Sequence, residues 1–96
     1  QGLNLGIRTV TASASVSIRD ATVLADATAG AVTITLPAVA DASGMVVSVK
    51  KIDASGNSVT IDGAGAETID GAGTKVLAAQ YNVSTVHCDG ATWWIV

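Results

Sequence analysis

The stretch that decides the fold runs from Thr9 to Arg19 and reads T-V-T-A-S-A-S-V-S-I-R. Apolar and hydroxyl-bearing side chains alternate strictly along it, so an extended chain would carry the apolar ones on one face and Ser and Thr on the other. This period of two and the Ser/Thr content both exclude a helix. The stretch therefore predicts one long half-buried strand, or two strands that share a bend.

Shorter segments rich in β-branched residues continue from this stretch to the end of the chain. They lie at residues 21–25, 31–36, 45–51, 58–62, 75–79, 81–88 and 92–96. Gly, Asn and Asp separate them about every 8–12 residues, and Pro37 ends one of them. The S-G-N turn at 55–57 predicts a hairpin, and Asp89-Gly90 predicts another turn. The fold class expected is all-β, a small antiparallel β-sandwich or barrel of about seven to nine short strands.

Composition narrows the class of protein. The 96 residues suffice for one domain, and only 14% of them are charged, which is low for a small monomer with every face in water. We therefore expect another copy of the chain to cover part of the surface. A net charge of -3 argues against a nucleic-acid partner, and no apolar stretch is long enough to insert as a membrane helix. The single cysteine, Cys88, cannot form an internal disulfide.

Candidate chemical groups are few. The hexapeptide T-I-D-G-A-G occurs at 60–65 and again at 68–73, which suggests either a calcium-binding solenoid turn or, as we favour, two strand ends with Gly-rich turns. His87 and Cys88 are neighbours, so on a strand they point to opposite faces and cannot act together. Acidic residues near the Gly-rich turns are interpreted as solvated turn residues. We predict no catalytic, cofactor or metal site and no enzyme activity.

The aromatic residues are the best candidates for contacts with other molecules. Trp93 and Trp94 are consecutive, so a strand over 92–96 would bury one and present the other to the surface, a subunit or a ligand. Tyr81 and Val83 share one face of the segment 81–88, whereas Val86 and Cys88 share the other. Either a bulge shifts the alternation there, or both faces are buried. Trp93, Trp94 and Tyr81 are therefore the candidate interface or ligand contacts.

Four segments taken in order resemble a β-rich domain of bacteriophage tail-fibre and tail-spike proteins. They are V-L-A-D-A-T-A-G-A-V-T-I-T-L-P (23–37), V-V-S-V-K-K-I-D-A-S-G-N-S-V-T-I-D (46–62), E-T-I-D-G (67–71) and C-D-G-A-T-W-W-I-V (88–96). The resemblance implies a homotrimeric component of the virion tail, made in the host bacterial cytoplasm. Its implied partners are other tail proteins and a host surface polysaccharide or outer-membrane receptor. It implies no catalytic residues.

Two functions remain open on these observations. In the first, residues 1–20 are a lead-in strand from an upstream shaft or connector, and residues 21–96 form a trimeric sandwich that contributes to host attachment. In the second, the chain is a monomeric carbohydrate-binding or adhesin-like sandwich that uses surface Trp and Tyr side chains. Association distinguishes them, because a trimer should shield the Trp side chain that lies outside the core.

Overall fold

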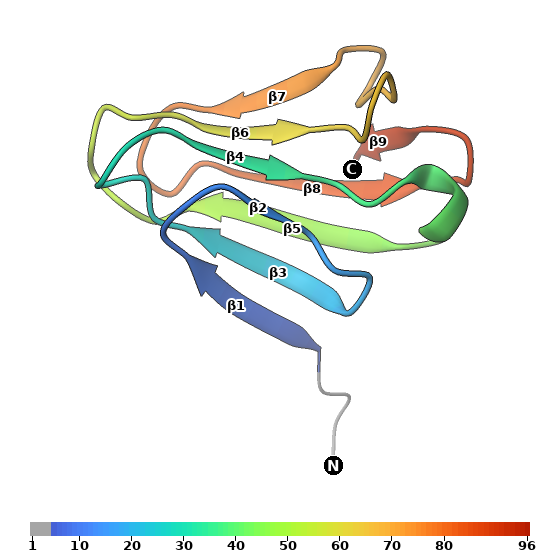
Figure 1. Cartoon of the computed structure of the whole chain (residues 1–96), viewed down its shortest axis with the longest axis horizontal. Helices are drawn as coiled ribbons and strands as arrows, with labels where there is room; N and C mark the ends of the chain where they lie inside the picture. The colour runs from blue at the N-terminus through green and yellow to red at the C-terminus, as the bar shows by residue number, and fades with distance from the viewer. Residues whose placement is uncertain (1–4) are drawn as a thin grey trace.

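Two mixed β-sheets packed face to face make up the computed structural model, which describes residues 5–96 (Figure 1). The larger sheet has the order β1 (Gly6–Val10), β3 (Asp20–Ala25), β5 (Val46–Lys51), β8 (Val83–Cys88) and β9 (Trp93–Ile95). The smaller has the order β2 (Ala14–Ser15), β4 (Val32–Thr35), β6 (Val59–Asp62) and β7 (Thr74–Leu77). One 3-10 turn, η1 (Val39–Asp41), interrupts these strands. The nine strands of the described residues confirm an all-β, sandwich-like class, and the sheets do not close into a barrel.

The first six strands form three stacked coils. The chain alternates between the sheets, so β1, β3 and β5 run parallel in the larger sheet and β2, β4 and β6 run parallel in the smaller one. Only the later strands β7, β8 and β9 pair antiparallel. The expectation of an antiparallel sandwich is therefore wrong for the first half of the chain. Alternation reports which face is buried and is the same for both strand directions.

The same architecture decides two local predictions. For the stretch Thr9–Arg19, the alternative of two strands that share a bend is confirmed: the chain bends at residues 11–13 and passes from β1 in the larger sheet to β2 in the smaller one. Its expected apolar row consequently splits, with Val16 buried and Ile18 64% exposed. The S-G-N turn joins β5 to β6, which lie in different sheets, so it forms an arch where a hairpin was expected. Residues 1–4 of the expected lead-in strand lie outside the described part, and β1 and β2 form the first coil.

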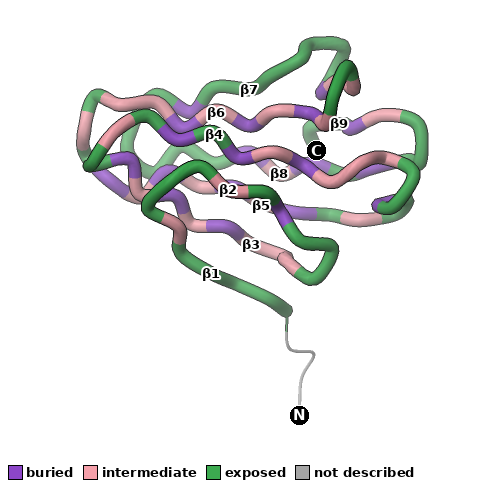
Figure 2. Tube along the Cα trace, viewed as in Figure 1, coloured by how far each residue is buried: buried purple, intermediate pink, exposed green. Residues whose placement is uncertain are grey.

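Small and β-branched side chains fill the space between the sheets. Figure 2 shows the buried positions alternating along the strands, as their sequence pattern predicts. In the smaller sheet, Val32 and Ile34 of β4 lie beside Val59 and Ile61 of β6. Trp93 is the one aromatic side chain buried among the described residues. Each coil thus buries little apolar area, and the fold depends on stacking the coils.

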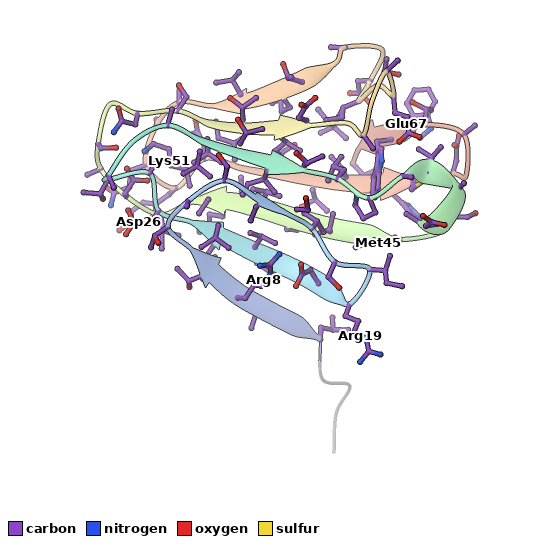
Figure 3. The ribbon with its side chains drawn as sticks, in the orientation of Figure 1. Arg8, Arg19, Asp26, Met45, Lys51 and Glu67 are labelled. Carbon is purple, nitrogen blue, oxygen red and sulfur yellow. The ribbon has the colours of Figure 1, made fainter. Side chains whose placement is uncertain are left out.

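A buried ion pair holds the turns together at one end of the sheets, near Asp26 in Figure 3. Lys51 is fully buried, and its Nζ lies 2.7 Å from Oδ2 of Asp53. The other carboxylate oxygen of Asp53 accepts a hydrogen bond from the Ala27 N–H at 2.9 Å, and the Ser55 hydroxyl donates to Oδ2. The Lys51 ammonium and then the Ser55 hydroxyl lower the pKa of Asp53 below its usual range. The pair therefore ties the β3–β4 turn to the β5–β6 arch.

Candidate functional site

The two neighbouring tryptophans lie on opposite sides of the larger sheet. Trp93 is fully buried next to Cys88, its register partner in β8, and its indole Nε1 has no hydrogen-bond partner. Trp94 is 49% exposed on the outer face, opposite His87. The alternation of a strand thus assigns Trp93 to the core and leaves Trp94 as the candidate contact residue.

A groove of about 440 Å³ opens beside Trp94, and we call it the Trp94 groove. Its lining residues are Ser43, Gly44, His87, Cys88, Asp89, Trp94 and Val96. The indole Nε1 of Trp94 donates a hydrogen bond of 2.9 Å to Oδ2 of Asp89. This bond fixes one edge of the ring and leaves an indole face available for contact. The volume falls within the range of small-ligand sites.

Asp89 organises the β8–β9 hairpin as well as the groove. Its Oδ1 accepts the N–H groups of Ala91 at 2.8 Å and Thr92 at 2.9 Å. Gly90 has a φ of 93°, which glycine adopts without strain, as the D-G turn predicted. The Trp94 indole, followed by the Ala91 and Thr92 amides, lowers the pKa of Asp89 to about 2. The carboxylate is therefore charged at neutral pH and already accepts three donors.

His87 and Cys88 point to opposite faces, as their adjacency predicted. Cys88 is 1% exposed and faces the core, whereas His87 is exposed in the Trp94 groove. They cannot form a nucleophile and base pair. Within residues 5–96, no three His, Cys, Asp or Glu side chains gather closely enough to hold a metal ion. The same residues contain no helix that is both long and apolar enough to span a membrane.

Tyr81 lies at the other end of β8, away from the groove. It precedes Val83, the first residue of β8, whereas Trp94 pairs with His87 near the last. His87 lies four positions after Val83 along the strand, a distance of roughly 13 Å. Tyr81 is 61% exposed, and its ring centroid lies 5.5 Å from the Lys50 Nζ. The structure does not bring Tyr81 and Trp94 together in one platform.

The repeated hexapeptide adopts two different conformations. In the first copy, Ile61 and Asp62 end strand β6. In the second, Ile69 and Ala72 exchange backbone hydrogen bonds around Asp70 and Gly71, whose φ angles are 52° and 82°. The interpretation as two strand ends is therefore confirmed for the first copy and wrong for the second, which forms a tight turn against β9. The Ile69 side chain is buried.

Sequence reasoning missed a larger feature, the outward-facing surface of the larger sheet. The register places on it Ile7, Thr9, Thr22, Leu24, Val46, Ser48, Lys50, Val83, Thr85, His87 and Trp94, and we call this set the outer sheet face. Ile7, Val46 and Val83 are 64%, 46% and 54% exposed. The hydroxyls of Ser48 and Thr85 bond each other at 2.7 Å. Lys50 is the one Lys, Arg, Asp or Glu among these residues.

The sequence did indicate this exposed face, through consecutive apolar residues within its strands. Val46 and Val47 are consecutive, so a strand must direct one of them outward. Tyr81 and Val83 are likewise exposed in the single chain because they face outward. Val86 and Cys88 face the core, as does Ser84. A strand with apolar residues on both faces indicates that something else covers the second face.

No protein-family model matches the chain, and no curated protein matches it.

Proposed function

We propose that the chain is a non-catalytic structural module of a bacteriophage tail fibre or tail spike, which assembles as a homotrimer and contributes to host-cell attachment. The resemblance of segments 23–37, 46–62, 67–71 and 88–96 to such domains supports the proposal. Its partners are two further copies of the chain, neighbouring tail proteins and a polysaccharide or protein receptor on the host surface. The module acts in the virion tail.

The outer sheet face is the observation that carries this proposal. Four large apolar side chains, Ile7, Val46, Val83 and Trp94, are about half or more exposed on one sheet surface. Polar residues are their register neighbours on this face, and a subunit interface typically removes such exposed apolar side chains from water. The internal hydrogen bond between Ser48 and Thr85 also reduces the cost of desolvating the face. Packing this face on another copy would account for the low charge of the chain.

Solution mass tests the proposal. Light scattering on a gel-filtration column should give three chains of 9.5 kDa each. Val83→Asp should dissociate the trimer, because it places a charge in the proposed interface. Val76→Asp is the matched control: Val76 is 49% exposed, but it lies on β7 of the smaller sheet. A single-chain mass for the unmodified protein, or equal effects of the two variants, would contradict assembly through this face.

The Trp94 groove favours a second candidate, a monomeric carbohydrate-binding module. An indole face held by Asp89 can stack on a sugar ring, and His87 and Ser43 can hydrogen-bond its hydroxyl groups. Acrylamide quenching separates the two candidates, because Trp93 is fully buried and Trp94 supplies the accessible fluorescence. In a trimer that covers the outer sheet face both side chains are shielded. In a monomeric lectin-like module Trp94 is quenched, and glycans protect it.

A further inference from the structure

Tyr81 occupies a backbone position that favours glycine. Its φ is 69°, in the left-handed region that bulky residues rarely adopt. It is the third residue of a reverse turn closed by the Asn82 N–H and the Ala79 carbonyl at 3.0 Å, and a positive φ at this position is typical of glycine in a type II turn. The backbone would therefore be satisfied better by glycine than by tyrosine.

The same residue is also the first position of a β-bulge. Tyr81 donates its N–H to the Lys51 carbonyl at 2.7 Å, and the Lys51 N–H donates to the Asn82 carbonyl at 2.9 Å. Two residues thus oppose one, with the first in a left-handed conformation, an arrangement in which glycine is the usual occupant. The bonds that define the turn and the bulge join backbone groups, and the side-chain hydrogen bonds of the turn come from Asn82 and Gln80. Neither explains a tyrosine side chain.

The tyrosine ring contributes little to the folded chain. It is 61% exposed, and its ring centroid lies 5.5 Å from the ammonium of Lys50. An exposed cation–aromatic contact stabilises weakly. Lys50 and its register partner Val83 belong to the outer sheet face. The Tyr81 ring therefore extends that face past Val83, the first residue of β8. A strained residue whose side chain serves no core is best explained by contact with another molecule.

If the other molecule is a second copy of the chain, as proposed above, interface area explains why Tyr81 is needed. Five strands about 4.8 Å apart and about 17–20 Å long form a plane of roughly 400–500 Å². A stable interface needs about 800 Å² from each partner. The outer sheet face therefore requires additional contacts at its margins, and one aromatic side chain can bury about 150–250 Å². Tyr81 lies at such a margin.

We propose that Tyr81 is an anchor residue of the interface with a second copy of the chain, kept in a strained conformation for the contacts of its ring. This inference rests on the trimer proposed above and assigns one residue to its interface. It predicts that ring and backbone have opposite effects. Loss of the ring weakens assembly, whereas glycine at this position relieves the backbone strain.

Three substitutions at Tyr81 and one neighbouring control test the inference. Light scattering across a dilution series should show Tyr81→Gly and Tyr81→Ala dissociating at concentrations at least about tenfold higher than the unmodified chain, as expected for an aromatic anchor. Tyr81→Phe keeps the ring and should assemble normally. Gln80→Ala, in the same exposed turn, should also assemble normally. At one fixed protein concentration, Tyr81→Gly should unfold at a higher urea concentration than Tyr81→Ala, because only glycine accepts the positive φ without strain.

The outcomes separate the anchor from the trimer itself. If the unmodified chain is a trimer and Tyr81→Gly dissociates at the same concentration, Tyr81 is not an anchor and the proposed function stands. If Tyr81→Ala unfolds at the same urea concentration as Tyr81→Gly, or at a higher one, the strain argument is overturned. If the unmodified chain is a monomer at every concentration, both the trimer and the anchor are wrong.

Discussion

Ser84 places a hydroxyl on the inner face of β8. The residue is 4% exposed, and its Oγ has no hydrogen-bond partner. Because a buried unsatisfied hydroxyl costs free energy, Ser84→Ala should leave the free energy of unfolding unchanged or raise it by about 1 kcal/mol, which corresponds to roughly 4–8 °C in Tm. Thermal unfolding followed by circular dichroism measures this shift. Ser48→Ala is the control and should lower Tm, since it breaks the bond to Thr85. A lower Tm for Ser84→Ala would show that its hydroxyl has a partner.

The Trp94–Asp89 hydrogen bond predicts a pH dependence. The pKa of Asp89 is lowered to about 2, so its charged form stabilises the fold above its unfolded value near 4. This contribution should be lost as the pH falls from about 4 to about 2. Trp94→Phe removes the largest cause, so the pKa of Asp89 should rise toward 3.8 while the Ala91 and Thr92 amides keep it below that value. Carboxyl NMR titration of both proteins measures the difference. An unchanged pKa in Trp94→Phe would exclude the indole as its cause.

At the scale of elements, hydrophobic alternation identified the strands and their buried faces. The apolar residues predicted to face inward in segment 31–36, Val32, Ile34 and Leu36, are all buried. Alternation could not identify partner strands, because parallel and antiparallel neighbours require the same pattern. Alternation also could not show that the chain changes sheet between β1 and β2, because the pattern does not identify the strands with which each of them pairs. Of the candidate contacts, the sequence predicted that one tryptophan is buried, but only the register identified it as Trp93.

Strand β1 offers a test of the parallel coils. The Asp26 N–H donates to the Val10 carbonyl at 2.9 Å, so Val10 directs its backbone groups toward β3. Thr9 is the adjacent residue, and its backbone groups point away from β3 at the free edge of the sheet. Thr9→Pro should therefore leave β1 paired, whereas Val10→Pro should release it. Amide hydrogen exchange of Asp26, whose N–H donates to Val10, and of Leu24, which faces the same side of β3, reports the pairing. Equal protection in the two variants would contradict this register.

At the scale of the whole molecule, the two ends of the stacked coils differ. At the last strand of the larger sheet, β9, the backbone of Thr68 and Asp70 hydrogen-bonds Trp93, and Oδ1 of Asp70 accepts the Ile95 N–H. At the first coil, Arg8 pairs with Asp20 at 3.1 Å and donates to the Ser15 carbonyl, which joins β1 to β2 across the core. Thus β9 is held at its edge of the larger sheet by backbone hydrogen bonds to residues 68–70. At the opposite edge, the Arg8 side chain links β1 to the smaller sheet. The first coil should be the least stable part of an isolated chain.

Stability should consequently depend on chain concentration. The core contains one aromatic side chain and otherwise mainly Val, Ile, Leu and Ala residues, and the outer sheet face leaves further apolar area exposed in a single chain. If assembly removes that area from water, unfolding and dissociation are coupled, and mass action makes Tm rise with concentration. For a trimer, a roughly hundredfold dilution should lower Tm by on the order of 10 °C. Differential scanning calorimetry at several concentrations, with scan rates varied to detect kinetic trapping, measures the dependence. A Tm that stays constant through this dilution and at every scan rate would show that the three coils and their antiparallel strands are stable as a monomer.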